Sequence, residues 1–86
     1  MPSMTPEDQT LERAVVAAIN ARMGAKRISI AELARMMDRP YDSTRNYLVG
    51  ERSMPLDFLL AAADALGVPA DTIVREGREQ FFESNA

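Results

Sequence analysis

Helix start and stop signals recur along the whole 86-residue chain, and they constrain its fold more than any other feature of the sequence. Proline or a capping hydroxyl precedes each of five segments, at Thr5-Pro6, Ser29, Pro40, Pro55 and Pro69. Proline suits the first turn of a helix, and a hydroxyl caps its free amides. No run alternates between apolar and polar residues with the period of a strand. The sequence therefore predicts an all-α fold, a compact bundle of five short helices.

The first expected helix covers residues 6–23 and ends at Gly24. Its apolar residues recur three and four positions apart, which places them on one side of a helix. Glycine is the residue that most often follows the last turn of a helix. Residues 1–5 carry no such pattern, and we expect them to be disordered.

A second and a third short helix follow, with a tight turn between them. Ser29 and Glu32 have the spacing of a capping box, so the second helix begins there. It ends near Met37, because Pro40 lacks an amide hydrogen and disfavours helical backbone in the residue before it. The third helix is expected over residues 41–49. Two short helices joined by such a turn form a helix-turn-helix, whose second helix enters the major groove of DNA.

The fourth helix is expected to begin after Pro55, to end at Gly67 and to be the most buried. The fifth is short and is expected to break at Gly77. A chain of this length can bury only one core. We therefore assign residues 6–76 to one helix-turn-helix domain and residues 77–86 to a C-terminal tail.

Three phenylalanines have no obvious place in the predicted core. Phe58 falls on the side of the fourth helix that is expected to be less buried, and Phe81 and Phe82 follow Gly77. One explanation is a tail that folds back over the fourth helix. The other, which we prefer, is a homodimer surface that would let two copies read half-sites about one helical turn apart.

The sequence contains no cysteine and no histidine. A disulfide framework, a Cys/His zinc site and a nucleophilic triad based on His or Cys are therefore excluded. No carboxylate pair or phosphate-binding glycine loop stands out, so we expect neither an enzyme nor a metal, cofactor or small-molecule ligand. The apolar runs are too short to cross a bilayer and the N-terminus lacks a signal-peptide layout, which makes a cytoplasmic location the default expectation.

Charge is divided unevenly along the chain. The formal net charge of −3 argues by itself against a nucleic-acid partner. Residues 22–52, however, hold seven basic and four acidic side chains, a local net charge of +3, whereas the remainder holds three basic and nine acidic ones, a net charge of −6. Such a bipolar molecule can present its basic side to DNA. Solvated helix faces without an electrostatic role are the alternative.

Residues 11–74 resemble the Cro and lambda-repressor-like (Xre) helix-turn-helix proteins. The resemblance rests on the runs ISIAELARMM, STRNYLVGER and MPLDFLLAAADALGVPADTI. It implies that the helix beginning near Tyr41 is the recognition helix and that the helix beginning at Ser29 lies across the phosphate backbone. Three positions depart from the family's usual turn glycine, capping serine and phosphate-contacting glutamine: Asp38, Pro40 and Ile30. Aspartate still permits the turn, because it tolerates a left-handed backbone.

Candidate base contacts lie on the outer side of the third helix. Arg45 can form two hydrogen bonds with guanine, and Asn46 can form two with adenine. The N-terminus of a recognition helix enters the groove deepest, which adds Tyr41, Asp42 and Ser43. Asp42 can accept a hydrogen bond from cytosine or orient Arg45. An ordinary solvated helix face is the alternative.

Candidate phosphate contacts surround these residues. Backbone amides at the start of a helix suit an anion, so we place Ser29 and Ile30 among the phosphate contacts. Four cations at the rim complete the set: Lys26, Arg27, Arg39 and Arg52.

The sequence therefore predicts a regulator that binds double-stranded DNA through the major groove, as a repressor of phage or antitoxin type. The alternative is a protein-interaction module on the same scaffold, which would use its acidic faces and the three phenylalanines. Fold alone does not decide between them.

Overall fold

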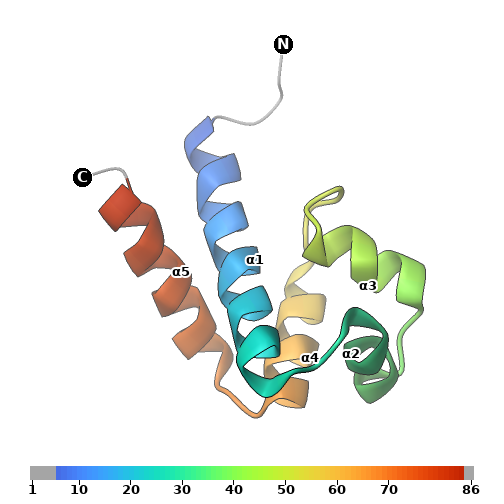
Figure 1. Cartoon of the computed structure of the whole chain (residues 1–86). Helices are drawn as coiled ribbons and strands as arrows, with labels where there is room; N and C mark the ends of the chain where they lie inside the picture. The colour runs from blue at the N-terminus through green and yellow to red at the C-terminus, as the bar shows by residue number, and fades with distance from the viewer. Residues whose placement is uncertain (1–5, 85–86) are drawn as a thin grey trace.

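The computed structural model describes residues 6–84, which form five α-helices and, within that range, no strand (Figure 1). The predicted all-α fold class is confirmed. Residues 1–5, which we expected to be disordered, lie outside the described residues. The helices are α1 (Pro6–Lys26), α2 (Ile30–Met37), α3 (Tyr41–Leu48), α4 (Leu56–Leu66) and α5 (Ala70–Ser84).

Helix α4 is the centre of the core, as its sequence predicts. Apolar side chains from all five helices pack into one cluster, and α4 supplies the largest share. Removal of these side chains from water is the main driving force for such a bundle. The α4 residues in the cluster are Phe58, Leu59, Ala62, Ala63 and Leu66.

Phe58 is fully buried, so its expected place on a tail or dimer surface is wrong. Its ring meets the ring of Tyr47 edge-on, with 4.9 Å between the centroids. The guanidinium of Arg39 lies 5.7 Å from the centre of the same ring. Residues from α3 and from the turn before it therefore cover this side of α4. Helical period alone could not reveal that cover, because it comes from another part of the chain.

Helix α1 continues through Gly24, so its predicted end at this glycine is wrong. Arg27 instead adopts the left-handed backbone, with φ at 57°. The amides of Arg27 and Ile28 donate to the carbonyls of Gly24 and Met23 at 3.1 and 2.9 Å. This pair of bonds is the Schellman motif, whose left-handed position usually holds glycine. A glycine inside a helix costs only about 1 kcal/mol, which tertiary packing can offset.

Helix α5 is continuous through Gly77, so the predicted break there is wrong and the boundary drawn at residue 77 falls inside a helix. Gly77 is buried where α5 crosses α1. A Cβ atom at this position would lie 2.8 Å from the Cα of Val15. The glycine thus serves the close approach of two helices and does not end one.

An ion pair joins the same two helices. The Nε of Arg22 donates to Oε1 of Glu76 at 3.3 Å, and its Nη2 donates to Oε2. The hydrogen-bonded carboxylate raises the pKa of Arg22 above its ordinary value. Helices α1 and α5 therefore pack side by side, and α1 lies between α5 and α3 (Figure 1).

Candidate nucleic-acid interface

Helices α2 and α3 are joined by a turn of three residues, 38–40. Asp38 has φ 55° and ψ 49°, so the expected left-handed turn at this aspartate is confirmed. The amides of Asp38 and Arg39 donate to the carbonyls of Arg35 and Ala34 at 3.1 and 2.9 Å. These bonds satisfy the last carbonyls of α2 and fix the corner between the two helices.

The N-terminus of α2 carries the predicted capping box. The hydroxyl oxygen of Ser29 accepts the amide of Glu32 at 3.1 Å, and the Glu32 carboxylate accepts the amide of Ser29 at 2.9 Å. The bond from the Ser29 amide lowers the pKa of Glu32, which keeps a negative charge at this helix end. Of the first-turn amides of α2, those of Ile30 and Ala31 have no partner among the described residues. An anion at α2 would therefore meet these two amides, beside the charge of Glu32.

Helix α3 is tied to another helix at its C-terminal end. At its N-terminal end, the buried hydroxyl of Thr44 donates to the carbonyl of Pro40, which directly precedes the helix, at 2.8 Å. At the other end, the side-chain amide of Asn20 donates to the carbonyls of Leu48 and Val16 at 3.0 and 3.1 Å. Sequence reasoning missed Asn20, although a carboxamide directly after an apolar run was an available signal. This residue ties the end of α3 to α1.

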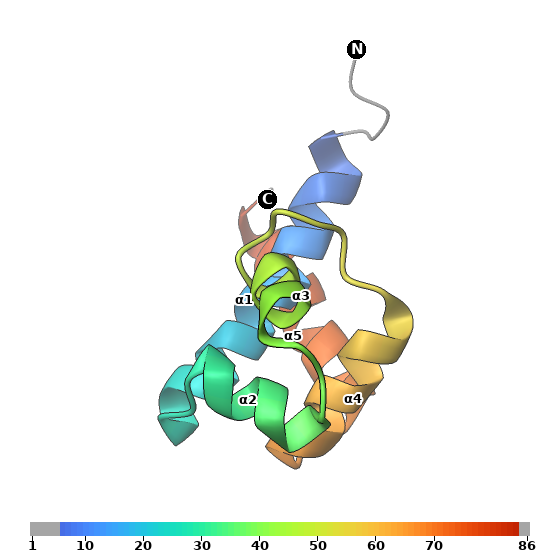
Figure 2. The ribbon, with the colours of Figure 1, turned by 90° about the vertical axis from the view of Figure 1, so that its right-hand side faces the viewer.

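The N-terminal end of α3 points away from α5 in Figure 1, and Figure 2 shows the molecule from the side to which it points. Tyr41 is 49% exposed and Asp42 is also exposed. Ser43 is half-buried, and its hydroxyl donates to the carbonyl of Pro40 at 3.4 Å. A partner that approaches this side reaches these residues first.

Arg45 and Asn46 lie one turn further along α3. The side chain of Arg45 is 44% exposed, and its Nη1 lies 3.5 Å from Oε1 of Glu51. Asn46 is half-buried, and its carbonyl accepts the amides of Glu51 and Arg52 at 2.9 and 3.2 Å. Both side chains are accessible from outside, although Arg45 has a carboxylate of its own chain as a neighbour.

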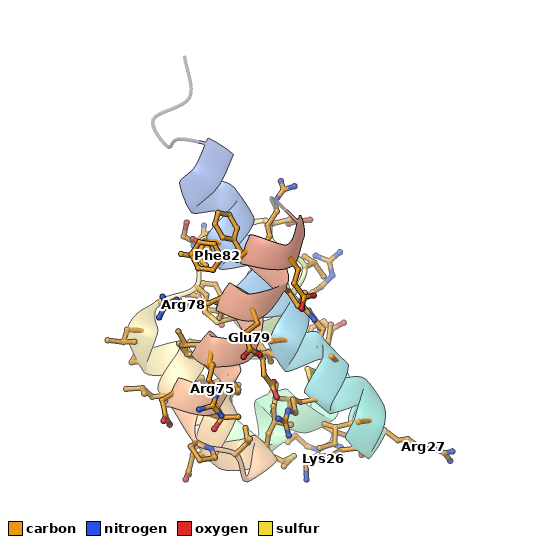
Figure 3. The ribbon with its side chains drawn as sticks, turned by 90° about the vertical axis from the view of Figure 1, so that its left-hand side faces the viewer. Lys26, Arg27, Arg75, Arg78, Glu79 and Phe82 are labelled. Carbon is orange, nitrogen blue, oxygen red and sulfur yellow. The ribbon has the colours of Figure 1, made fainter. Side chains whose placement is uncertain are left out.

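The four predicted phosphate-binding cations fall into two groups. Arg39 donates from Nη2 to Oδ2 of Asp57 at 3.2 Å. Lys26, Arg27 and Arg52 are exposed, and none of the ion pairs among the described residues includes them. Figure 3 shows Lys26 and Arg27 projecting from the end of α1. Three cations are therefore free to meet phosphate, and the fourth is already paired.

The remaining predicted aromatic residues lie on α5. The rings of Phe81 and Phe82 are in contact, with 5.3 Å between the centroids. Phe81 is half-buried and Phe82 is 57% exposed, whereas Phe58 is in the core. The three phenylalanines therefore do not form a single surface.

No family model, curated protein or solved structure matches this chain. In the part of the chain that the structure describes, no helix combines the length and apolar character needed to cross a membrane. The same residues include no cluster of side chains suited to hold a metal ion. The outward side of α3 and the exposed cations Lys26, Arg27 and Arg52 are thus the features from which a function can be argued.

Proposed function

We propose that this protein is a sequence-specific DNA-binding protein that inserts α3 into the major groove of double-stranded DNA, and that it acts as a small repressor of phage or antitoxin type. The observation that carries the proposal is the outward N-terminal end of α3, fixed from below by Thr44 and by the bond from Asn20 to Leu48. A recognition helix has to be both exposed and rigid. Contact with DNA in the cell requires the cytoplasmic location that the sequence leads us to expect.

The dimensions and side chains of α3 suit the groove. An α-helix with its side chains is about 10–12 Å across, and the major groove is about 12 Å wide, so α3 fits the groove. Arg45 would pair with guanine and Asn46 with adenine. A surface ion pair such as that of Arg45 with Glu51 is worth about 0–1 kcal/mol, less than the ~1–3 kcal/mol of a two-bond contact with a base. The carboxylate therefore does not prevent Arg45 from reading a base.

Binding to the phosphate backbone rests on few charges. Lys26, Arg27 and Arg52 are the unpaired cations of the predicted set. Each neutralised phosphate contributes about −0.9 to the slope of log K against log salt, so the expected slope is about −3. The net charge of −3 further weakens nonspecific binding. Contacts with bases are therefore expected to contribute more of the binding free energy than contacts with phosphates.

The proposal is tested by selecting bound duplexes from a random pool and comparing the selected duplex with a scrambled one. Arg45→Ala is expected to remove the preference for the selected duplex while the fold survives, because Arg45 is exposed. Lys26→Ala is expected to weaken binding to both duplexes equally. It should also reduce the slope of log K against log salt by about one. The matched control is Arg13→Ala on α1, an exposed cation outside the predicted contact set, which should change neither property. If Arg45→Ala lost affinity equally for both duplexes, Arg45 would have no role in reading bases.

A protein-interaction module is the second candidate. It is favoured by apolar side chains that α4 leaves in contact with water, those of Leu56 at 70% and Leu60 at 51% exposure. Exposed apolar patches often mark binding surfaces. If the chain selects no duplex from the random pool, this candidate replaces the first.

A further inference from the structure

The outer side of α5 carries a group of charged and aromatic residues at helical spacing. They line one shallow depression on the side of the molecule that faces the viewer in Figure 3, and none of the other described helices covers them there. Positions three and four apart lie on the same side of a helix. We call the following residues the outer α5 face: Arg75, Arg78, Glu79, Phe82 and Glu83.

The order of charges on the outer α5 face does not suit α5 alone. Arg75 and Arg78 are like charges three positions apart, and Glu79 and Glu83 are like charges four positions apart, spacings that destabilise an isolated helix. Arg75 and Glu79 have opposite charges four positions apart, but they form none of the ion pairs among the described residues. The basic residues come before the acidic ones, which opposes the helix dipole. Within the described residues, none of the four takes part in an ion pair. On the inner side of α5, by contrast, Glu76 is neutralised by Arg22 of α1. The outer charges therefore lack the partners that the inner one has.

We propose that the outer α5 face pairs with the same face of a second copy, with the two α5 helices antiparallel. A two-fold axis between Arg78 and Glu79 sets Arg78 of each copy opposite Glu79 of the other. The same axis sets Arg75 of each copy opposite Phe82 of the other, and it sets Glu83 opposite Val74, one residue from Arg75. Every charge then meets an opposite charge, whereas a parallel arrangement would set like charges together.

A second copy fits this face better than an unrelated partner does. The face has two positive and two negative side chains, so its net charge is zero. The charge pattern also inverts about its own centre, which is the symmetry that a contact between identical surfaces requires. An unrelated protein would have no reason to impose that symmetry.

Phe82 supplies the apolar part of the contact. Its ring is 57% exposed, and the guanidinium of Arg78 lies 5.9 Å from the ring centre. In the antiparallel pair, Arg75 of the second copy covers the same ring with its aliphatic stem. One face of one helix is a small interface, so we expect a weak dimer that forms and dissociates readily.

The pairing determines where the two α3 helices lie, a consequence that rests on the proposed function. Helix α5 is on the opposite side of the molecule from α3, and the two helices do not touch (Figure 1). A two-fold rotation at the outer α5 face therefore directs the two α3 helices outward on opposite sides of the dimer. Such a dimer would hold two separate duplex segments. It differs from the dimer expected from the sequence, which would read adjacent half-sites on one duplex.

Sedimentation equilibrium of the full chain over a concentration series tests the pairing. The average mass is expected to rise from 9.5 kDa towards twice that value. Arg75→Glu with Arg78→Glu, and separately Glu79→Arg with Glu83→Arg, should each weaken self-association at least tenfold. A variant with all four charges exchanged keeps the net charge at −3, and this variant should self-associate as the wild type does. All four side chains are exposed, so the helical circular dichroism should not change.

A monomeric mass at every concentration would overturn the proposal, and so would a four-charge variant that stays monomeric while the wild type dimerises. A dimer that persists in both double variants would overturn it as well, and would point to another surface such as that of Leu56 and Leu60. A second assay measures whether the protein captures a labelled duplex on an immobilised duplex. Together with the mass measurement, it separates this inference from the proposed function. A monomer that still selects a duplex refutes only the pairing, and a dimer that binds no DNA refutes only the DNA-binding proposal.

Discussion

Two glycines inside helices should respond to the same substitution with opposite signs. A methyl group added at Gly24 in α1 would have no atom within 4 Å, whereas a methyl at Gly77 would meet Val15 Cα and Cγ2 at 2.8 Å and Val15 N at 2.9 Å. Alanine is favoured over glycine in a helix by about 0.5–1 kcal/mol. Gly24→Ala is therefore expected to raise the free energy of unfolding by that amount.

For Gly77→Ala the same gain is outweighed by overpacking, which costs about 1–3 kcal/mol. Two of the three atoms met by the new methyl are backbone atoms, so a rotamer change of Val15 cannot relieve the contact and α1 must move. The cost should lie near the upper end of that range, which gives a net loss of about 1–2 kcal/mol.

Thermal unfolding followed by circular dichroism measures both changes. In a domain of this size about 1 kcal/mol corresponds to roughly 4–8 °C in Tm. We expect Gly24→Ala to raise Tm by several degrees and Gly77→Ala to lower it by a similar or larger amount. If both variants were stabilised equally, the close contact between α1 and α5 would be refuted.

Three other predictions concern the parts that frame α3. Arg27→Gly should raise the free energy of unfolding by about 1 kcal/mol in urea titration, because the left-handed backbone strains arginine; a loss of stability would contradict this. Ser29→Ala should lower it by about 1 kcal/mol. Because the pKa of Glu32 is lowered in the folded state, the capping box stabilises above the ordinary pKa of that carboxyl and is lost as pH falls through the lowered value. Urea titrations across acidic pH should therefore show a smaller pH dependence in Glu32→Gln, which has no carboxyl at this position, and an identical dependence would exclude the link. Asn20→Ala should cost about 1–2 kcal/mol and speed amide exchange at the end of α3; unchanged exchange there would show that Asn20 does not fix the helix.

The sequence predicted the helices wherever their ends depend on local chemistry. The capping box of Ser29 with Glu32 and the left-handed Asp38 both act within a few residues of the chain, and both are present. Periodicity also identified α4 as the main core helix. Local preference was enough in these places because no tertiary contact opposed it.

Three of the four errors share one physical cause, which is contact between distant segments. Gly77 carries the usual signal for a helix end, yet it lies inside α5, where α1 passes close by. The error at Gly24 is local, because the helix ends three residues later at the left-handed Arg27. Phe58 was assigned to the surface because the cover from Tyr47 depends on how α3 folds over α4. Asn20 was missed for the same reason, since its partner at Leu48 is 28 residues away. Single-residue preferences cannot predict such pairings.

In the candidate interface, too, some features could be predicted from the local sequence and others could not. Exposure along α3 follows from its own period, so Tyr41, Asp42 and Arg45 could be named from the sequence. The ion pairs of Arg39 with Asp57 and of Arg45 with Glu51 could not be predicted, because both acids lie outside α3. Sequence reasoning therefore identified the cations but not which of them have a carboxylate as a neighbour.

Protection of guanine N7 from methylation, on a duplex selected from the random pool, tests the central claim most directly. The N7 atom lies in the major groove, where α3 is proposed to bind. We predict that the wild-type protein protects at least one guanine and that Arg45→Ala binds without protecting it. Binding that leaves every guanine N7 reactive, or protection that is unchanged in Arg45→Ala, would contradict the claim that α3 reads the major groove through Arg45.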